Sequence, residues 1–85
     1  MSIVITRATK EHYRDVGALF DLYRQFYKYK TNLQASTKYI KDRINKNESF
    51  IFLCLYKKKP AGFVQLYETF DSLNIKKKLI LYDLY

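Results

Sequence analysis

The feature that most restricts how this chain can fold is an uninterrupted apolar segment, Phe-Ile-Phe-Leu-Cys-Leu-Tyr, at residues 50–56. It is far shorter than the roughly 20 residues that a membrane-spanning helix needs. Apolar side chains occupy both alternating sets of positions, which is typical of a central strand that is covered on both faces. The segment therefore predicts a strand over residues 49–56 in the middle of a sheet.

A first strand and a first helix are expected before this segment. Residues 3–5, Ile-Val-Ile, predict the strand, and Thr9 is a suitable N-cap for a helix with Glu11 in its first turn. Gly17 lies within this helix and indicates close packing against a neighbour. Apolar residues recur at steps of three and four, which places them on one helical face: Tyr13, Val16, Leu19, Phe20, Tyr23, Phe26 and Tyr27.

A second helix should begin at the T-x-x-Q capping box formed by Thr31 and Gln34. Its buried face is expected to carry four residues: Leu33, Thr37, Ile40 and Ile44. Beyond the central strand, turn and strand signals predict a turn at 57–60, an antiparallel strand at 61–67, a polar link at 68–74 and a last strand at 79–85.

The expected fold class is α+β, with element order β-α-α-β-β-β, an antiparallel sheet of about four strands and two helices on one face. A chain of 85 residues has room for a single domain, 1–85. No covering element follows the apolar strand 79–85 in the sequence, so we expect an exposed strand edge. A second copy in a homodimer, or a complementary chain, would pair with this edge.

The chain is basic, with 16 Lys and Arg against 8 Asp and Glu and a net charge of +8. Six of the positive charges lie in two lysine triplets, at 57–59 and 76–78, in a connection and at a strand start. Lysine is a common solvated residue at such positions and discourages edge pairing. Binding of nucleic acid remains an alternative, but solubility and steering of an anionic ligand account for the charge more simply.

The chemistry-bearing residues exclude several functions. Cys54 is the only cysteine, so no internal disulfide forms, and a reducing, cytoplasmic location is expected because residues 1–7 also lack the features of a secretory signal. His12 stands alone near a helix start. Because there is no Cys/His cluster, carboxylate pair or serine-triad spacing, we expect neither a bound metal nor hydrolase chemistry.

Four short segments carry a resemblance to a known family. They are Leu-Tyr-Arg-Gln-Phe-Tyr at 22–27, Glu-Ser-Phe-Ile-Phe at 48–52, Gly-Phe-Val-Gln-Leu-Tyr at 62–67 and Leu-Tyr-Asp-Leu-Tyr at 81–85. In this order, and with this element order, the whole chain resembles the first half of the GNAT-type N-acetyltransferases. In the family the last segment is usually Leu-Asn-Asp-Leu-Phe, so Tyr82 here replaces the Asn.

The resemblance implies acetyl-CoA as cofactor and an amine as acetyl acceptor. In the family, a loop of R/Q-x-x-G-x-G/A type after the fourth strand holds the cofactor's pyrophosphate through its backbone amides and the following helix. The only glycines here are Gly17 and Gly62, and neither belongs to such a loop. The resemblance therefore implies a truncated GNAT-like domain that is inactive alone or active only in an assembly.

The same resemblance assigns candidate site residues. Tyr23, Phe26 and Tyr27 would line the acceptor pocket, although core packing is the other reading and is favoured for Phe26. The backbone of Leu84 and Tyr85 would hydrogen-bond the acetyl and pantetheine groups. Asp83 would draw a proton from the acceptor amine, or it is simply a carboxylate at a strand edge.

Three functions are therefore carried forward. The first is acetyl-CoA-dependent transfer of an acetyl group to an amine by a truncated enzyme. The second is a non-catalytic interaction module that dimerises through its terminal strand. The third is a basic protein that binds nucleic acid, which we regard as the weakest because most tyrosines fall at core spacing.

Overall fold

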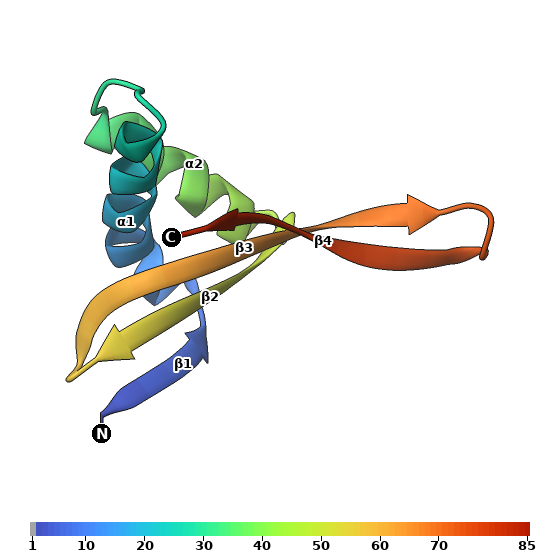
Figure 1. Ribbon diagram of the computed structural model, residues 1–85, viewed down its shortest axis with the longest axis horizontal. Coiled ribbons are helices and arrows are strands. Elements are labelled where there is room, and N and C mark those ends of the chain that lie inside the picture. Colours follow the sequence, from blue (N-terminus) through green and yellow to red (C-terminus); the bar gives the residue numbers. More distant parts are fainter. Residues whose placement is uncertain (1) are drawn as a thin grey trace.

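The computed structural model describes residues 2–85 and contains two helices and one sheet (Figure 1). The elements follow the predicted order β-α-α-β-β-β, with a short 3-10 turn before the first helix. Their bounds are β1 (Ile3–Arg7), η1 (Lys10–His12), α1 (Tyr13–Phe26), α2 (Leu33–Asn45), β2 (Ser49–Tyr56), β3 (Lys59–Asp71) and β4 (Lys76–Leu84).

The four strands form one antiparallel sheet in the order β1-β2-β3-β4. β2 has the predicted bounds and lies inside the sheet, between β1 and β3. Both helices lie against the same face, where apolar side chains of helices and strands form the core: Ala8, Val16, Leu19, Ile40, Ile51, Leu53 and Phe63. The predicted α+β fold class is confirmed.

The expectation that β2 is covered on both faces is wrong within residues 2–85. Ile51 and Leu53 are buried under the helices, whereas Phe50, Phe52 and Cys54 point to the opposite face and stay partly exposed. The run of apolar residues correctly indicated that both faces of β2 are apolar. An apolar face is not necessarily a covered one, and here only one face is covered.

Thr9 caps the start of the helical segment as predicted, but it caps the 3-10 turn that precedes α1. Its side chain accepts a hydrogen bond from the backbone of Glu11, and the His12 ring accepts one from the backbone N–H of Thr9. Gly17 is where α1 and α2 approach each other. A Cβ atom there would lie 2.7 Å from the Thr37 Cα, so no larger residue fits without moving a helix.

The connection between α1 and α2 is held by one buried carboxylate, that of Asp21. Its two oxygens accept hydrogen bonds from the Thr31 hydroxyl (2.6 Å), the Asn32 backbone N–H (2.8 Å), the Ser36 hydroxyl (2.8 Å) and the Gln25 amide (3.0 Å). The hydrogen bond from Thr31 is the largest factor that lowers the pKa of Asp21, and burial opposes it. Asp21 therefore fixes where α2 starts relative to α1.

This arrangement corrects two predictions for the second helix. The hydroxyl of Thr31 donates a hydrogen bond to Asp21, and Thr31 is not the N-cap of the helix, so the predicted capping box with Gln34 does not form. Instead Asn32 is the N-cap, and its side chain accepts from the Ala35 backbone at 3.1 Å. Leu33, expected on the buried face, is 54% exposed because it is the first residue of the helix, whereas Ile40 is buried as predicted.

The last two strands are longer than predicted. β3 continues through part of the expected polar link to Asp71, and β4 starts already at Lys76. The two strands form a hairpin that projects beyond the helices (Figure 1). In this extension lysines of β4 lie opposite residues of β3, Lys77 opposite Phe70 and Lys76 opposite Asp71. Both faces of the extension are solvated, so its polar composition did not indicate strands.

Replacing Asp21 with Asn should lower the free energy of unfolding by about 1–3 kcal/mol, because an amide offers one acceptor oxygen where the carboxylate receives four hydrogen bonds. A lowered carboxyl pKa stabilises the fold above the unfolded-state value and loses that effect as the pH falls through the folded-state pKa. The variant should therefore lose less stability than the wild type on acidification.

Urea denaturation at neutral and acidic pH measures both effects. Asp42→Asn is the matched control, since Asp42 forms only an exposed ion pair with Lys38 at 2.7 Å. Equal effects of the two substitutions would contradict the structural role of Asp21.

Candidate functional site

A chain of three buried polar side chains crosses the helix-facing side of the sheet. The Ser49 hydroxyl donates to Gln65 Oε1 at 2.8 Å, and Gln65 Nε2 donates to Asp83 Oδ2 at 2.8 Å. The three residues come from β2, β3 and β4, and each is less than a tenth exposed. Because Gln65 uses its oxygen for Ser49, its amide group must point its donors at Asp83, which fixes the orientation of that carboxylate.

A β-bulge places Asp83 at this position. Gln65 pairs with Asp83, but its neighbour Leu66 pairs with Leu81, so Tyr82 is an additional residue in β4. A bulge locally bends the strand and redirects its side chains. The ring of Tyr82 consequently lies edge-on to Tyr67, with 5.4 Å between ring centroids.

Tyr23 of α1 lies beside Asp83. Burial, followed by its interaction with the Asp83 carboxylate, raises the pKa of Tyr23 to about 12. The hydroxyl therefore remains protonated at neutral pH and is able to donate a hydrogen bond. The ring of Tyr23 packs edge-on against Phe63 (5.8 Å) and Tyr85 (6.2 Å), which closes the apolar side of the site.

A second pair of hydroxyls lies further along β3. The hydroxyls of Tyr39 and Tyr67 are 2.7 Å apart, and burial, then the hydrogen bond to Tyr39, raises the pKa of Tyr67. The Arg43 guanidinium lies 4.4 Å from the ring centroid of Tyr39. This pair adjoins a small cavity of about 300 Å³ lined by Phe20, Arg24, Ala35, Ser36 and Tyr39.

The structure brings together only some of the residues predicted for the acceptor pocket. Tyr23 and Tyr27 are in edge-on contact, with ring centroids 5.2 Å apart. Phe26, for which core packing was favoured, is 71% exposed and contacts Tyr27 from outside, so that preference was wrong. The helical spacing put Phe26 on the same face, but α1 ends at this residue, beyond the margin of the sheet.

The backbone groups predicted to bind the cofactor are not equivalent. Tyr85 and Phe63 exchange both backbone hydrogen bonds at 3.0 Å, so the N–H and C=O of Tyr85 are already used in the sheet. In an antiparallel pair the next residue faces the other way, and the N–H and C=O of Leu84 therefore point to the open edge. Of the two residues whose backbone was expected to hydrogen-bond the cofactor, only Leu84 has its N–H and C=O free of the sheet.

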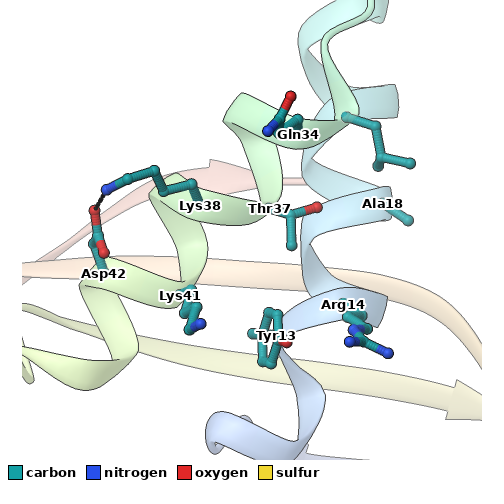
Figure 2. Close-up of a pocket in the computed structure, with 9 residues that line it drawn as sticks. Tyr13, Arg14, Ala18, Gln34, Thr37, Lys38, Lys41 and Asp42 are labelled. Atoms are coloured by element: carbon teal, nitrogen blue, oxygen red, sulfur yellow. Dashed lines mark hydrogen bonds and ion pairs between the residues drawn. The ribbon is translucent and has the colours of Figure 1, made fainter.

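A larger groove of about 870 Å³ lies between exposed residues of the two helices (Figure 2). Tyr13, Arg14 and Ala18 of α1 line one side of it, and residues of α2 line the other. One ion pair within the groove joins Lys38 to Asp42. The groove contains no buried polar group comparable to Asp83, so the chemistry of the chain is concentrated on the sheet side of the helices.

Residues 2–85 were also compared with the requirements of a metal site and of a membrane-spanning helix. Over this range no three His, Cys, Asp or Glu residues lie close enough together to hold a metal ion. Neither of the helices described there is long and apolar enough to cross a membrane.

Comparison with known proteins gives the family. The N-acetyltransferase YhfO of Bacillus subtilis (strain 168), itself uncharacterized, is 37% identical over 70 residues, which are 82% of this chain and 47% of YhfO. The crystal structure of a probable acetyltransferase matches the whole chain at 40% identity, with a TM-score of 0.87 over 56% of that protein. The chain belongs to the GNAT-type N-acetyltransferase superfamily. It has part of the GNAT fold and spans about half the length of these relatives.

Other solved acetyltransferases share the GNAT fold at lower identity. A predicted acetyltransferase from Clostridium acetobutylicum, solved with acetyl-CoA, is 9% identical and has a TM-score of 0.76 over 99% of this chain and 59% of that protein. No protein-family model matches the chain.

Sequence reasoning missed the polar side chains that hold the candidate site together. Gln65 and Ser49 lie at positions whose neighbours along the strand, Phe63 and Ile51, face the core. A polar residue at the buried positions of an alternating strand requires a partner, and that was the available signal. Tyr67 and Tyr39 gave none, because tyrosine at core spacing is also explained by packing.

Tyr23→Phe should remove one tyrosine whose pKa, about 12, lies above the usual value near 10. A raised tyrosine pKa stabilises the fold below the unfolded-state value near 10 and loses that effect as the pH rises towards about 12. The variant should therefore unfold less steeply with rising alkaline pH than the wild type. Tyrosinate absorbance combined with urea denaturation measures this, and Tyr29→Phe, an exposed position, is the control. An unchanged alkaline titration in Tyr23→Phe would contradict the placement of Tyr23 beside Asp83.

Proposed function

We propose that this chain provides the amine-binding side of an acetyl-CoA-dependent N-acetyltransferase. The single observation that supports this is Asp83, a carboxylate 7% exposed at the end of β4, oriented by Gln65 and adjacent to the hydroxyl of Tyr23. A buried carboxylate needs a positive or hydrogen-bonding partner. An alkylammonium ion supplies both.

Tyr23 and Tyr85 suit the same ligand. Their rings are 6.2 Å apart and flank the end of β4, where the carboxylate is. The faces of aromatic rings attract cations, and their apolar area accommodates the carbon chain of an amine. The exposed ring of Tyr27 extends this surface outward.

The residues present fit part of the cofactor. The outward N–H and C=O of Leu84 suit an extended amide such as that of pantetheine, which would add to the edge of β4 as a further strand does. The 85 residues contain no R/Q-x-x-G-x-G/A loop for the pyrophosphate. We therefore propose that acetyl transfer requires an assembly in which another segment holds that group, and that the chain alone is inactive.

The proton balance assigns a role to each side chain. Acetyl-CoA would supply the acetyl group as a thioester: the amine nitrogen would bond to the carbonyl carbon as the carbon–sulfur bond breaks. A bound ammonium ion loses two protons in this transfer, and the second of them would go to sulfur, so that CoA leaves as the thiol. The amine must lose a proton to react, and the carboxylate of Asp83 accepts it. Tyr23, neutral because its pKa is about 12, donates a hydrogen bond that holds the carboxylate or the amine in position.

Asp83→Asn should weaken the binding of a primary amine by at least about tenfold, because it removes the buried charge that faces the ammonium group. The fold should persist, since the Asn oxygen can still accept from Gln65. The measurement is an NMR shift titration with n-butylamine as its ammonium ion, and with n-butanol as the neutral ligand of equal shape.

Asp71→Asn is the matched control, because Asp71 lies in the same hairpin and hydrogen-bonds only the exposed Asn74. The proposal is wrong if butylammonium and butanol bind alike, or if Asp83→Asn binds the amine as the wild type does. Calorimetric titration with acetyl-CoA and CoA tests the cofactor separately, and micromolar affinity of the chain alone would contradict the required assembly.

Homodimerisation through β4 is a second candidate, supported by a specific observation. β4 is an edge strand, and between 79 and 84 its only charged residue is Asp83, which points into the sheet's helix-covered side. Leu84→Pro removes an outward N–H without breaking a hydrogen bond of the sheet. Sedimentation should show a dimer for the wild type and a monomer for this variant; a wild-type monomer at all concentrations would contradict edge pairing.

A further inference from the structure

The β3–β4 hairpin projects beyond the helices and carries at its end the most exposed large apolar side chains of residues 2–85 (Figure 1). Leu73 is 95% exposed, Ile75 90% and Phe70 73%. Single exposed apolar side chains are common on soluble proteins, whereas a group of them on a projecting element marks an interaction surface. This hairpin tip, residues 70–75, takes no part in the proposed amine site.

The hairpin tip is ordered by hydrogen bonds of its own. The Asp71 carboxylate accepts from the backbone N–H of Asn74 at 3.3 Å and from its side-chain amide at 2.8 Å, and the Ile75 N–H donates to the Ser72 carbonyl at 3.2 Å. Ile75 has a φ of 55°, a left-handed conformation that is an outlier for a β-branched residue. Such strain is typical of functional segments. The turn therefore presents an apolar side chain where Asn or Gly would suit the backbone better.

Three exposed lysines follow the tip directly: Lys76, Lys77 and Lys78. Side chains alternate along a strand, so Lys77 points to one face of the hairpin and the other two point to the opposite face. Lys77 pairs with Glu68 at 3.5 Å, and within residues 2–85 no carboxylate lies within ion-pair distance of Lys76 or Lys78. At about 3.3 Å per residue, these lysines, here called the lysine collar, all lie within about 10 Å of Ile75 along the strand.

A hollow of about 460 Å³ lies beside the tip. Phe70 and Ile75 give it apolar walls, and Lys76 and Lys77 give it positive charge. Asp71 also lines it, but both of its carboxylate oxygens are engaged within the turn. The hollow therefore suits a ligand that joins an anionic group to an apolar one, as a phospholipid does.

We infer that the hairpin tip docks on the surface of an anionic lipid bilayer, with Leu73 and Ile75 at the outer ends of the acyl chains and the lysine collar among the phosphates. Amphipathic elements at a bilayer surface bury their apolar side chains about 5–10 Å deep, which is the distance between tip and collar. Lysine stems lie in the apolar layer while their ammonium groups stay at the headgroups. The net charge of +8 attracts the chain to such a surface from a distance.

The shape and charge of the tip favour a bilayer over a second copy of the chain. A projecting tip needs a matching pocket in a protein, whereas a fluid bilayer accommodates it without one. The groove of about 870 Å³ between α1 and α2 is the largest hollow described in residues 2–85, and Arg14, Lys38 and Lys41 line it. These cations would repel the lysine collar of another copy.

The test is co-sedimentation of the 85-residue chain with vesicles of phosphatidylcholine alone, or of equal parts phosphatidylcholine and phosphatidylglycerol. The chain should bind the anionic vesicles at least about tenfold more tightly. Leu73→Asn together with Ile75→Asn should weaken that binding at least about tenfold, and Asn readily adopts the left-handed conformation of the turn. Leu22→Asn with Leu33→Asn is the matched control, because these side chains are 48% and 54% exposed on the helices. It should bind as the wild type does.

A second pair of variants tests the lysine collar. Lys76→Gln with Lys78→Gln should weaken binding to the anionic vesicles at least about tenfold, because both charges lie next to the tip. Lys58→Gln with Lys59→Gln removes the same charge from exposed residues of the other lysine triplet, near the turn between β2 and β3. It should weaken binding less than about threefold, since those lysines face away from a bilayer that holds the hairpin tip.

A fluorescence measurement does not depend on a loss of binding. The chain has no tryptophan, so Leu73→Trp places a single reporter at the tip, and tryptophan suits the bilayer interface. Its emission should shift to shorter wavelength with anionic vesicles and should be quenched when their phosphatidylcholine carries brominated acyl chains. Leu33→Trp, on α2, is the control and should not be quenched.

Several results would overturn the inference. They are absence of binding to either kind of vesicle, equal binding to both kinds, undiminished binding by the Leu73 and Ile75 double variant, and an unquenched reporter at the tip. Equal losses for the two pairs of lysine variants would show that a basic chain adsorbs without orientation. A dimer that the tip variant dissociates, without vesicle binding, would show that the tip contacts a second copy instead.

Discussion

The arrangement of the molecule depends on the four hydrogen bonds received by the Asp21 carboxylate. They join the C-terminal half of α1 to the first turn of α2 and so fix how the two helices lie over the sheet. At Gly17 the same helices approach so closely that a Cβ atom would lie 2.7 Å from the Thr37 Cα. Tyr23, two residues after Asp21, is thereby held over β4. The geometry of the polar site therefore depends on the connection between α1 and α2, although no residue of that connection belongs to the site.

Much of the fold could be predicted from sequence because local patterns determined it. The bounds of β2 and the helical face of α1 follow from apolar periodicity, and the order of elements follows from these. The start of α2 was mispredicted because Asn32, and not Thr31, is its N-cap. The hydroxyl of Thr31 donates instead to Asp21, a tertiary partner ten residues earlier in the chain that the local pattern does not reveal.

The site was less predictable for a related reason. Asp83 and Tyr23 were found through family resemblance, whereas Gln65 and Ser49, which orient the carboxylate, matter only in the register of three neighbouring strands. The bulge at Tyr82 shifts this register by one residue. The composition of β4 gives no indication of the bulge. Exposure of Phe26 likewise depends on where α1 leaves the sheet.

The strand pairings also set an order of assembly. β3 and β4 are joined by a short turn and pair locally, so their hairpin closes with little loss of chain entropy. β1 pairs with β2 across both helices, from Ile3 to Tyr56, and must wait for them. We therefore expect Gln65 and Asp83 to pair before α1 brings Tyr23 beside them, so that Asp83 is oriented while it is still open to solvent and is buried last.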